Sequence, residues 1–206
     1  GCVTGLIGRN GAGKSTAFKL ILGLIRADGG KITIDDKNAA DLDSDTKRKL
    51  GVVLAESGFS GYLKIKDVAK ILKAAYPSFK EDDFMSQCEK QSLPKDKQIK
   101  EFSTGMKAKL KILAALSHDA EVLILDEPTS GLDVIARSDL WDIISSLKGK
   151  VTIILTTHYM EEAEALSDRI AIMKDGKLLI CDTAEKIKET TGENTFEKAF
   201  ISVVKG

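Results

Sequence analysis

A glycine-rich segment at residues 8–16 limits most strongly how this chain can fold. It reads Gly-Arg-Asn-Gly-Ala-Gly-Lys-Ser-Thr and satisfies the spacing G-x-x-x-x-G-K-[ST]. An apolar run at residues 2–7 precedes it, and residues 15–25 follow with apolar side chains at helical spacing. Glycines let a backbone bend so that its N–H groups point at phosphate oxygens, and the start of the next helix adds a partial positive charge. The sequence therefore predicts a strand, a phosphate-binding loop and a helix. The predicted loop consists of Gly8, Arg9, Asn10, Gly11, Ala12, Gly13, Lys14, Ser15 and Thr16.

Two carboxylates, Asp126 and Glu127, end a second apolar run at residues 122–125. Adjacent acids at the tip of a buried strand are costly unless a cation lies nearby. Asp126 fits a direct or second-sphere Mg²⁺ ligand, beside the hydroxyl of Ser15, and Lys14 can reach the β- and γ-phosphates of a nucleotide. Glu127 points in a different direction and can polarise an attacking water. Alone, such a strand end is often simply solvated, but the phosphate loop favours a catalytic role.

Strands and helices alternate in two parts of the chain, residues 1–55 and 117–206. This alternation predicts an α/β core whose mainly parallel sheet is covered by helices on both faces. Asp175-Gly176 predicts a hairpin between residues 170–173 and 178–180. Residues 56–116 lack a strong strand pattern and show helical spacing, so we expect an all-helical subdomain inserted into the core. Further strands are expected at residues 31–35, 50–54 and 151–155, and further helices at residues 136–147, 160–166, 183–190 and 196–204.

The composition supports one globular domain with a subdomain. The 206 residues are 43% hydrophobic and 30% charged, and 31 basic residues balance 31 acidic ones. Zero net charge argues against a broad nucleic-acid-binding face. The most apolar stretch, residues 20–25, is far shorter than the roughly 20 residues of a membrane span. Cys2, Cys88 and Cys181 form no CxxC or His/Cys cluster, so the sequence predicts neither a disulfide framework nor a zinc site and favours a reducing compartment.

Three further motifs, in their order along the chain, resemble the nucleotide-binding subunit of ATP-binding cassette (ABC) transporters. Residues 102–106 read Phe-Ser-Thr-Gly-Met at the start of a helix, before the acidic strand. Residues 128–133 read Pro-Thr-Ser-Gly-Leu-Asp, and residues 156–158 read Thr-Thr-His. The resemblance covers essentially the whole chain. It implies a phosphate-loop NTPase core with a helical subdomain, and an ATPase that uses ATP and Mg²⁺.

The resemblance also implies roles for individual residues. In the family, the positions of Ser103, Thr104 and Gly105 contact the γ-phosphate of ATP bound to the opposite subunit. Two ATP molecules are therefore sandwiched in a homo- or heterodimer, whose interface would include Asp133, Ser103 and Gly105. His158 matches the histidine that touches the γ-phosphate, so the catalytic residues would be Glu127, His158 and Lys14. The other histidine, His118, is expected at the surface.

The chain departs from the family pattern in three places. The signature of the family usually reads Leu-Ser-Gly-Gly-Gln. The variant at residues 102–106 resembles the signatures of exporters of peptides, antibiotics, lipids or ions. Ala55 stands where a glutamine usually binds Mg²⁺, and the adjacent Glu56 is the candidate substitute. Family members carry an antiparallel β-subdomain before the phosphate loop. Since seven residues precede Gly8, we expect this subdomain to be missing or truncated.

The implied partners are a second ATPase subunit and separate transmembrane permease subunits. The permease would dock near residues 57–63 (Ser57 to Leu63), with Phe59 and Tyr62 as contacts, although both could instead pack in the subdomain core. The protein would then be cytoplasmic and peripheral on the inner face of the membrane. The alternative is a non-transport ABC ATPase that acts on nucleic acid or the ribosome. The absence of a coiled-coil pattern between Thr16 and Phe102 and the neutral charge disfavour it, and no nucleic acid is expected.

Overall fold

A six-stranded sheet forms the centre of the computed structural model, which describes residues 1–205. Five neighbouring strands are parallel, and the last one, at the edge, is antiparallel. In spatial order the strands are β4 (Leu50–Val53), β5 (Val122–Asp126), β6 (Thr152–Thr157), β1 (Val3–Ile7), β7 (Arg169–Lys174) and β8 (Lys177–Asp182). The mainly parallel sheet expected from the alternation of strands and helices is confirmed.

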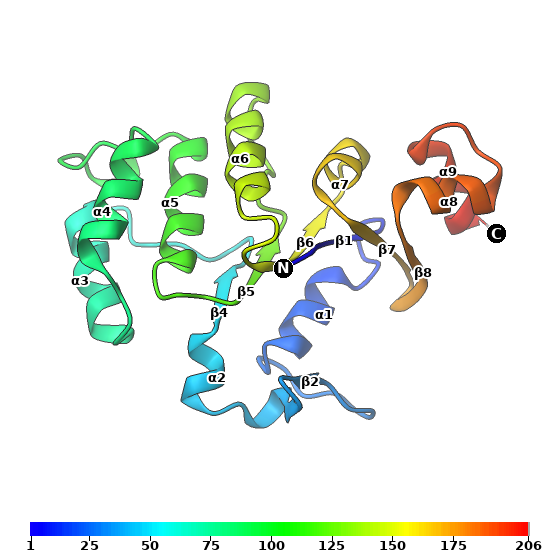
Figure 1. Cartoon of the computed structure of the whole chain (residues 1–206), viewed down its shortest axis with the longest axis horizontal. Coiled ribbons are helices and arrows are strands. Elements are labelled where there is room, and N and C mark those ends of the chain that lie inside the picture. The colour runs from blue at the N-terminus through cyan, green and yellow to red at the C-terminus, as the bar shows by residue number, and fades with distance from the viewer. Residues whose placement is uncertain (206) are drawn as a thin grey trace.

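Helices cover both faces of this sheet (Figure 1). On one face lies α1 (Lys14–Ile21), whose Phe18 packs against Ile124 of β5. On the other face lie α6 (Val134–Ser146) and α7 (Met160–Leu166). Leu140 of α6 packs there against Leu123 and Leu125. Because successive side chains of a strand point to opposite faces, a strand covered on both sides must be apolar throughout, as residues 122–125 are.

The predicted hairpin joins β7 to β8 at one end of the sheet. Asp175 and Gly176 have φ angles of 49° and 75°, as a two-residue type I′ turn requires. Two helices, α8 (Ala184–Thr191) and α9 (Phe196–Lys205), pack beside this hairpin (Figure 1). Phe196 lies in a buried cluster with Ile170 and Ile172 of β7, which closes this end of the core.

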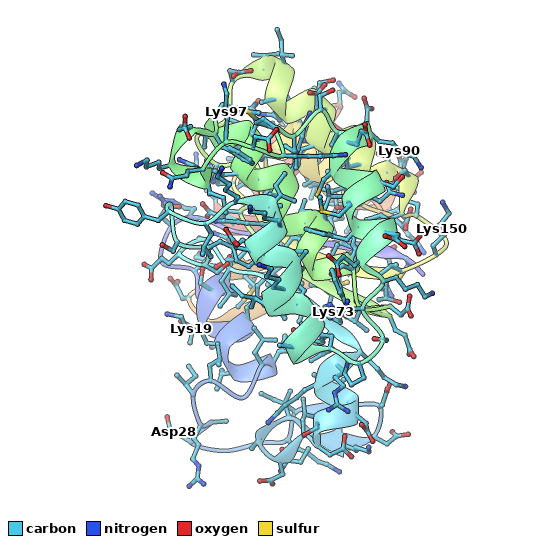
Figure 2. The ribbon with its side chains drawn as sticks, turned by 90° about the vertical axis from the view of Figure 1, so that its left-hand side faces the viewer. Lys19, Asp28, Lys73, Lys90, Lys97 and Lys150 are labelled. Carbon is cyan, nitrogen blue, oxygen red and sulfur yellow. The ribbon has the colours of Figure 1, made fainter. Side chains whose placement is uncertain are left out.

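The helical part lies at the opposite end of the molecule. It consists of α3 (Ile65–Ala75), α4 (Glu81–Lys90), the short 3₁₀ helix η2 (Ile99–Glu101) and α5 (Thr104–Leu116). These elements share their own buried cluster, which includes Val68, Phe84 and Leu110. Figure 2 shows α3 and α4 from outside, with Lys73 and Lys90 projecting from them. A separate core supports the proposed division into residues 1–55 and 117–206 on one side and 56–116 on the other. Within residues 1–205, no helix is long and apolar enough to cross a membrane.

Two elements between β1 and β4 differ from the prediction. The first helix ends at Ile21 rather than Ile25, because the amides of Gly23 and Leu24 turn back to the carbonyls of Leu20 and Lys19. The strand expected at residues 31–35 shrinks to two residues and lies outside the main sheet. The segment contains β2 (Thr33–Ile34), β3 (Lys37–Asn38), η1 (Ala39–Asp41) and α2 (Ser44–Arg48).

The expectation that His118 lies at the surface is wrong. His118 is only 4% exposed, and its ring stacks on that of Tyr76 with the ring centroids 3.9 Å apart. Its Nε2 lies 3.2 Å from the carbonyl oxygen of Leu50 in β4. Ser78, in the segment that joins α3 to α4, donates a hydrogen bond from its hydroxyl to the His118 carbonyl at 2.9 Å, and Tyr76 covers the imidazole ring. Burial lowers the pKa of His118, so the imidazole is neutral at pH 7.

Candidate functional site

Three of the predicted motifs meet at the carboxyl ends of three adjacent strands. The loop 8–13 follows β1, Asp126 and Glu127 end β5, and His158 follows β6. Parallel strands bring their carboxyl ends to the same edge of a sheet, which is where ligands bind in such folds. A cavity of about 290 Å³ lies at this edge. It is lined by Asn10, Gly11, Ala12, Gly13, Lys14, Ser15, Thr16 and Glu127.

The loop is shaped for a phosphate group. Gly11 and Gly13 have φ angles of 82° and 100°, a region that disfavours other residues. Gly13 precedes α1 without any side-chain cap, so the first N–H groups of the helix are available to an anion. The Lys14 ammonium is buried and donates to the carbonyl of Gly8 at 2.9 Å and to that of Arg9 at 3.4 Å. These contacts hold a positive charge against the loop.

Asp126 is buried at the end of β5 and fits a magnesium ligand. Its Oδ1 accepts a hydrogen bond from the Thr156 hydroxyl at 2.6 Å and another from the Ser15 hydroxyl at 3.3 Å. Ser15 and Asp126 therefore present two hard oxygen donors side by side. Residues 1–205 contain no cluster of three or more His, Cys, Asp or Glu side chains that could hold a metal alone. Mg²⁺ fits such a site, because it usually takes one or two protein oxygens together with phosphate oxygens and water.

Glu127 and His158 form a second pair at the same edge. His158 Nδ1 lies 3.4 Å from Glu127 Oε2, with the two side chains 37% and 25% exposed. Glu127 has a φ of 48°, in the left-handed region of the backbone. Its N–H donates to both the hydroxyl and the carbonyl of Thr156, at 2.9 and 3.2 Å. The carboxylate is thus held near the phosphate loop and remains accessible to water.

Thr156 is a site residue that the sequence reasoning missed. Its hydroxyl donates to Asp126 and accepts from the Glu127 amide, so one side chain positions both acids. The residue is completely buried. Thr156 is the first residue of the Thr-Thr-His motif, in which the family resemblance assigns a function to the histidine alone. The sequence could have indicated this role through the parallel pairing of the two predicted strands, because that pairing places the ends of β5 and β6 side by side.

The signature residues lie away from this cavity. Ser103 caps α5, since its hydroxyl oxygen accepts from the N–H of Met106 at 3.1 Å, and Thr104 begins the helix. Both are exposed. A Cβ on Gly105 would stand 2.8 Å from the Ala136 Cβ, so this glycine permits close packing of α5 against α6. Neither Ser103 nor Asp133, which caps the exposed start of α6, lines the cavity beside the phosphate loop. Within one chain, the structure does not bring these residues to Lys14.

Ala55 lies beside the acidic pair, as the position of the family's glutamine requires. It lines a cavity of about 300 Å³ together with Asp126, Glu127 and Lys107. A methyl group cannot bind a metal ion, and the neighbouring Glu56 is exposed and does not line this cavity. The structure therefore offers no substitute ligand at this position.

The segment 57–63 borders a groove between the core and the helical part. The groove has a volume of about 720 Å³ and is largely apolar, and its charged lining residues are Lys47 and Lys111. Phe59 lines it and also packs against the helical core. Tyr62 is 75% exposed, with the Lys100 ammonium 4.9 Å from the centre of its ring. The two candidate contacts thus differ, because Phe59 packs partly in the helical core, whereas Tyr62 is mostly exposed beside Lys100.

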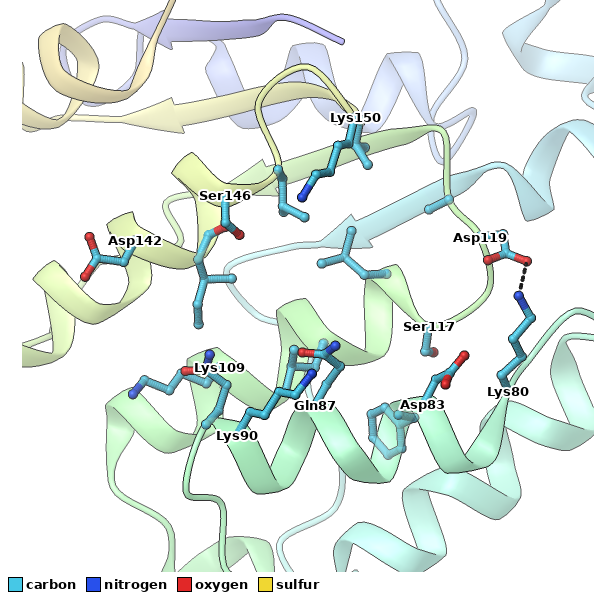
Figure 3. A pocket seen from close by; sticks show the side chains of 18 of the residues that line it. Lys80, Asp83, Gln87, Lys90, Lys109, Ser117, Asp119, Asp142, Ser146 and Lys150 are labelled. Carbon is cyan, nitrogen blue, oxygen red and sulfur yellow. Dashed lines mark hydrogen bonds and ion pairs between the residues drawn. The ribbon is translucent and has the colours of Figure 1, made fainter.

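A cavity of about 920 Å³ lies elsewhere, between α4, α5 and α6 (Figure 3). Its charged lining is balanced, and the Lys109–Asp139 ion pair, 2.7 Å long, joins α5 to α6 within it. The lysines are Lys80, Lys90, Lys109 and Lys150, and the aspartates are Asp83, Asp119, Asp139 and Asp142. None of the predicted site residues lines it, so it is a joint between the two parts of the molecule rather than the reactive centre.

Comparison with known proteins identifies the family. The sequence model of the family described as "ABC transporter" matches residues 1–130. The chain belongs to the ABC transporter family. It is 37% identical over 196 residues to ABC transporter ced-7 of Caenorhabditis elegans, a match that covers 91% of this chain and 11% of ced-7. It is 31% identical over 199 residues to the daunorubicin resistance ATP-binding protein DrrA3 of Streptomyces coeruleorubidus, covering 93% of this chain and 63% of DrrA3. The chain thus spans only part of each relative.

Solved structures of ABC proteins share the fold. A structure described as the ATP binding subunit of an ABC transporter matches with a TM-score of 0.86 and 26% identity, over 98% of this chain and 88% of that one. A dimeric ATP-binding cassette in a post-hydrolysis state, bound to ADP and Pi, matches with a TM-score of 0.75 and 22% identity, over 88% of this chain and 85% of that one. These likenesses confirm the phosphate-loop NTPase fold that the resemblance to ABC proteins implied.

Proposed function

We propose that this chain binds ATP with Mg²⁺ and hydrolyses it as the nucleotide-binding subunit of an ABC exporter. One observation carries the proposal: a single cavity is lined both by residues 10–16 of the phosphate loop and by Glu127, and the Ser15 hydroxyl in it donates to Asp126. Membership of the ABC transporter family supports the same activity. DrrA3 is named for daunorubicin resistance, and this supports export rather than uptake.

The geometry suggests how hydrolysis proceeds. The loop amides and Lys14 bind the phosphates. Ser15 and Asp126 would hold Mg²⁺, whose charge would offset that of the phosphate oxygens. Glu127 orients a water for in-line attack on the γ-phosphorus and takes its proton while the bond to the ADP oxygen breaks. His158, 3.4 Å from Glu127, holds this carboxylate and stabilises the charge on the transferred group.

Two subunits would share the nucleotides. Ser103 and Asp133 are exposed and do not line the cavity beside the phosphate loop of their own chain, which is what a site completed by a second subunit requires. Helix α5 offers its N-terminus, with Ser103 and Thr104 exposed, to a phosphate group of the partner. Loss of the γ-phosphate would remove the group that joins the two halves, and the dimer would then loosen.

The permease would bind in the groove beside residues 57–63. This groove lies between the two parts of the molecule, so an occupant would sense their relative movement. Phe59 lines the groove itself, whereas Tyr62 lies outside it and, being 75% exposed, is the better candidate for a contact at the surface of the segment 57–63. Docking there would place the chain on the cytoplasmic face of the membrane, as a peripheral subunit of an exporter of peptides, antibiotics, lipids or ions.

The test is ATP hydrolysis by the purified chain, with wild type compared with Glu127→Gln. We expect turnover in the wild type and about a hundredfold or greater loss in the variant, since the base is removed while phosphate binding is retained. Gel filtration in ATP and Mg²⁺ should show a dimer of Glu127→Gln and a monomer when nucleotide is absent. Undiminished turnover in Glu127→Gln would exclude Glu127 as the base, and a wild type that neither binds nor hydrolyses ATP would contradict the proposal.

A further inference from the structure

Glu162 is a carboxylate that the proposed chemistry does not use, yet it is fully buried in α7. Its Oε2 accepts a hydrogen bond from the Thr129 hydroxyl, and its Oε1 accepts one from the Trp141 indole N–H, each at 3.0 Å. Both donors are uncharged. Burying a carboxylate against neutral donors is expensive, and an apolar side chain would hold these elements together at lower cost. The carboxylate therefore does more than fill the space between α6 and α7.

The two ends of the Thr129–Glu162 hydrogen bond lie close in sequence to the Glu127–His158 pair. Thr129 follows Glu127 by two residues, and Glu162 follows His158 by four. The hydrogen bond thus closes a ring of covalent and non-covalent links around the pair, whose own contact is 3.4 Å long. Thr129 is buried as well, so this bond is shielded from water. The distance between the loop 128–133 and the start of α7 is fixed by it.

Helix α6 makes a second connection to the same region. The Arg137 guanidinium lies 4.2 Å from the centre of the Tyr159 ring, and that ring lies 4.1 Å from the His158 ring. Arg137 and Trp141 are four residues apart and share one face of α6. Figure 1 shows α6 and α7 side by side above the sheet. Since α6 begins directly after Asp133, this helix contacts Glu162 through Trp141 and is linked to His158 through Arg137 and Tyr159.

We propose that Glu162 is a positioning residue: through Thr129 it sets the place of His158 relative to Glu127, and it transmits movement of the loop 128–133 to that pair. The inference rests on the ATP hydrolysis proposed above. Glu162 touches neither the phosphate loop nor its cavity. Its effect is therefore on kcat and leaves the binding of ATP unchanged.

Three variants separate this role from simple packing. Thr129→Val removes the hydroxyl that Glu162 binds, Thr129→Ser keeps it, and Trp141→Phe removes only the bond to α6. Steady-state ATP hydrolysis and thermal unfolding are measured for each. We expect Thr129→Val to lower kcat about tenfold with the KM for ATP within about twofold of wild type, because a misplaced catalytic pair slows only the chemical step. Thr129→Ser should restore kcat, and Trp141→Phe should lower the Tm while kcat stays within about twofold of wild type.

Other results would overturn the inference. If Thr129→Val keeps the wild-type kcat, or if Trp141→Phe lowers kcat as far as Thr129→Val does, Glu162 only stabilises the packing of α6 against α7. If the wild type hydrolyses ATP and Thr129→Val has the same kcat, the result contradicts only the role of Glu162. A wild type without ATP turnover contradicts the proposed function, and this inference with it.

Discussion

At the scale of single residues, the site depends on a strained backbone at Glu127. A left-handed conformation costs an L-residue about 1–2 kcal/mol. At Glu127, with φ 48°, the two hydrogen bonds of its N–H to Thr156 maintain it. The sequence predicted the two acids and their different directions, because adjacent residues at the end of a strand diverge. It could not predict the strain, since only the neighbouring strand β6 supplies the atoms that hold it.

Glycine and alanine at position 127 separate strain from chemistry. Both substitutions remove the carboxylate, so both should abolish hydrolysis. Glycine accepts a positive φ, whereas alanine does not, and we therefore expect Glu127→Gly to be more stable than Glu127→Ala by about 1 kcal/mol. Urea unfolding of the two variants measures this difference directly. Equal stability would mean that the backbone relaxes to an ordinary conformation once the carboxylate is gone.

At the scale of elements, Ser103 has two functions at the start of α5. Its oxygen accepts from the Met106 N–H, which caps the helix, and its own O–H remains able to donate to a partner's phosphate. Sequence reasoning found this helix start from the motif and the periodicity that follows. It did not find that Gly105 packs against Ala136, because α5 and α6 are neighbours only in the folded chain.

Two substitutions at Ser103 distinguish capping from phosphate binding. Aspartate is as good a cap as serine, whereas alanine is not, so Ser103→Asp should keep the stability of the wild type and Ser103→Ala should lose about 1 kcal/mol. Aspartate also places a negative charge where we propose that the partner's γ-phosphate binds. In the Glu127→Gln background, Ser103→Asp should therefore abolish the ATP-dependent dimer in gel filtration, although its thermal unfolding is normal. A stable dimer of Ser103→Asp would exclude this position from the interface.

The sequence predicts the boundaries of helices and strands where local residues determine them. It does not predict them where contacts with residues distant in the sequence determine them. Helix α7 was expected at residues 160–166 and lies there, and the Asp175-Gly176 hairpin formed as predicted. The strand expected at residues 31–35 forms only at Thr33–Ile34, because alternating side chains extend into a longer strand only where a neighbouring edge is available. That segment instead pairs with residues 37–38 alone.

At the scale of the whole molecule, the sequence indicated two parts but not the groove between them. Helical spacing identified residues 56–116 as a distinct part, and its separate buried cluster agrees with that view. Grooves arise from the way the parts meet, which periodicity does not encode. His118 illustrates the same limit, since its burial depends on Tyr76 and Leu50 from two other segments.

Lys111 lines this groove, and we expect its amine to lower the stability of the fold. It lines both the apolar groove and the cavity beside Glu127, and burial lowers the pKa of its amine from the ordinary value of 10.5. The folded state therefore disfavours the ammonium form, while the unfolded chain holds it freely. Below the lowered pKa, the charged amine destabilises the fold. As pH rises through the lowered pKa toward 10.5, the folded chain releases its proton first, and stability increases.

Replacing Lys111 with methionine should reveal how much the charged amine destabilises the fold. We expect Lys111→Met, which keeps the length of the side chain, to raise the Tm at pH 7 by about 2 °C. The difference from wild type should shrink as the pH is raised toward 10.5, because the wild-type amine then becomes neutral. Lys70→Met, on the exposed face of α3, is the matched control and should leave the Tm unchanged at every pH. A lower Tm for Lys111→Met would show that the lysine stabilises the fold, and an increase that does not vary with pH would show that the charge of the amine is not its cause. An increase would mean that this lysine is retained at the expense of stability, as expected of a side chain that serves a partner docked in the groove.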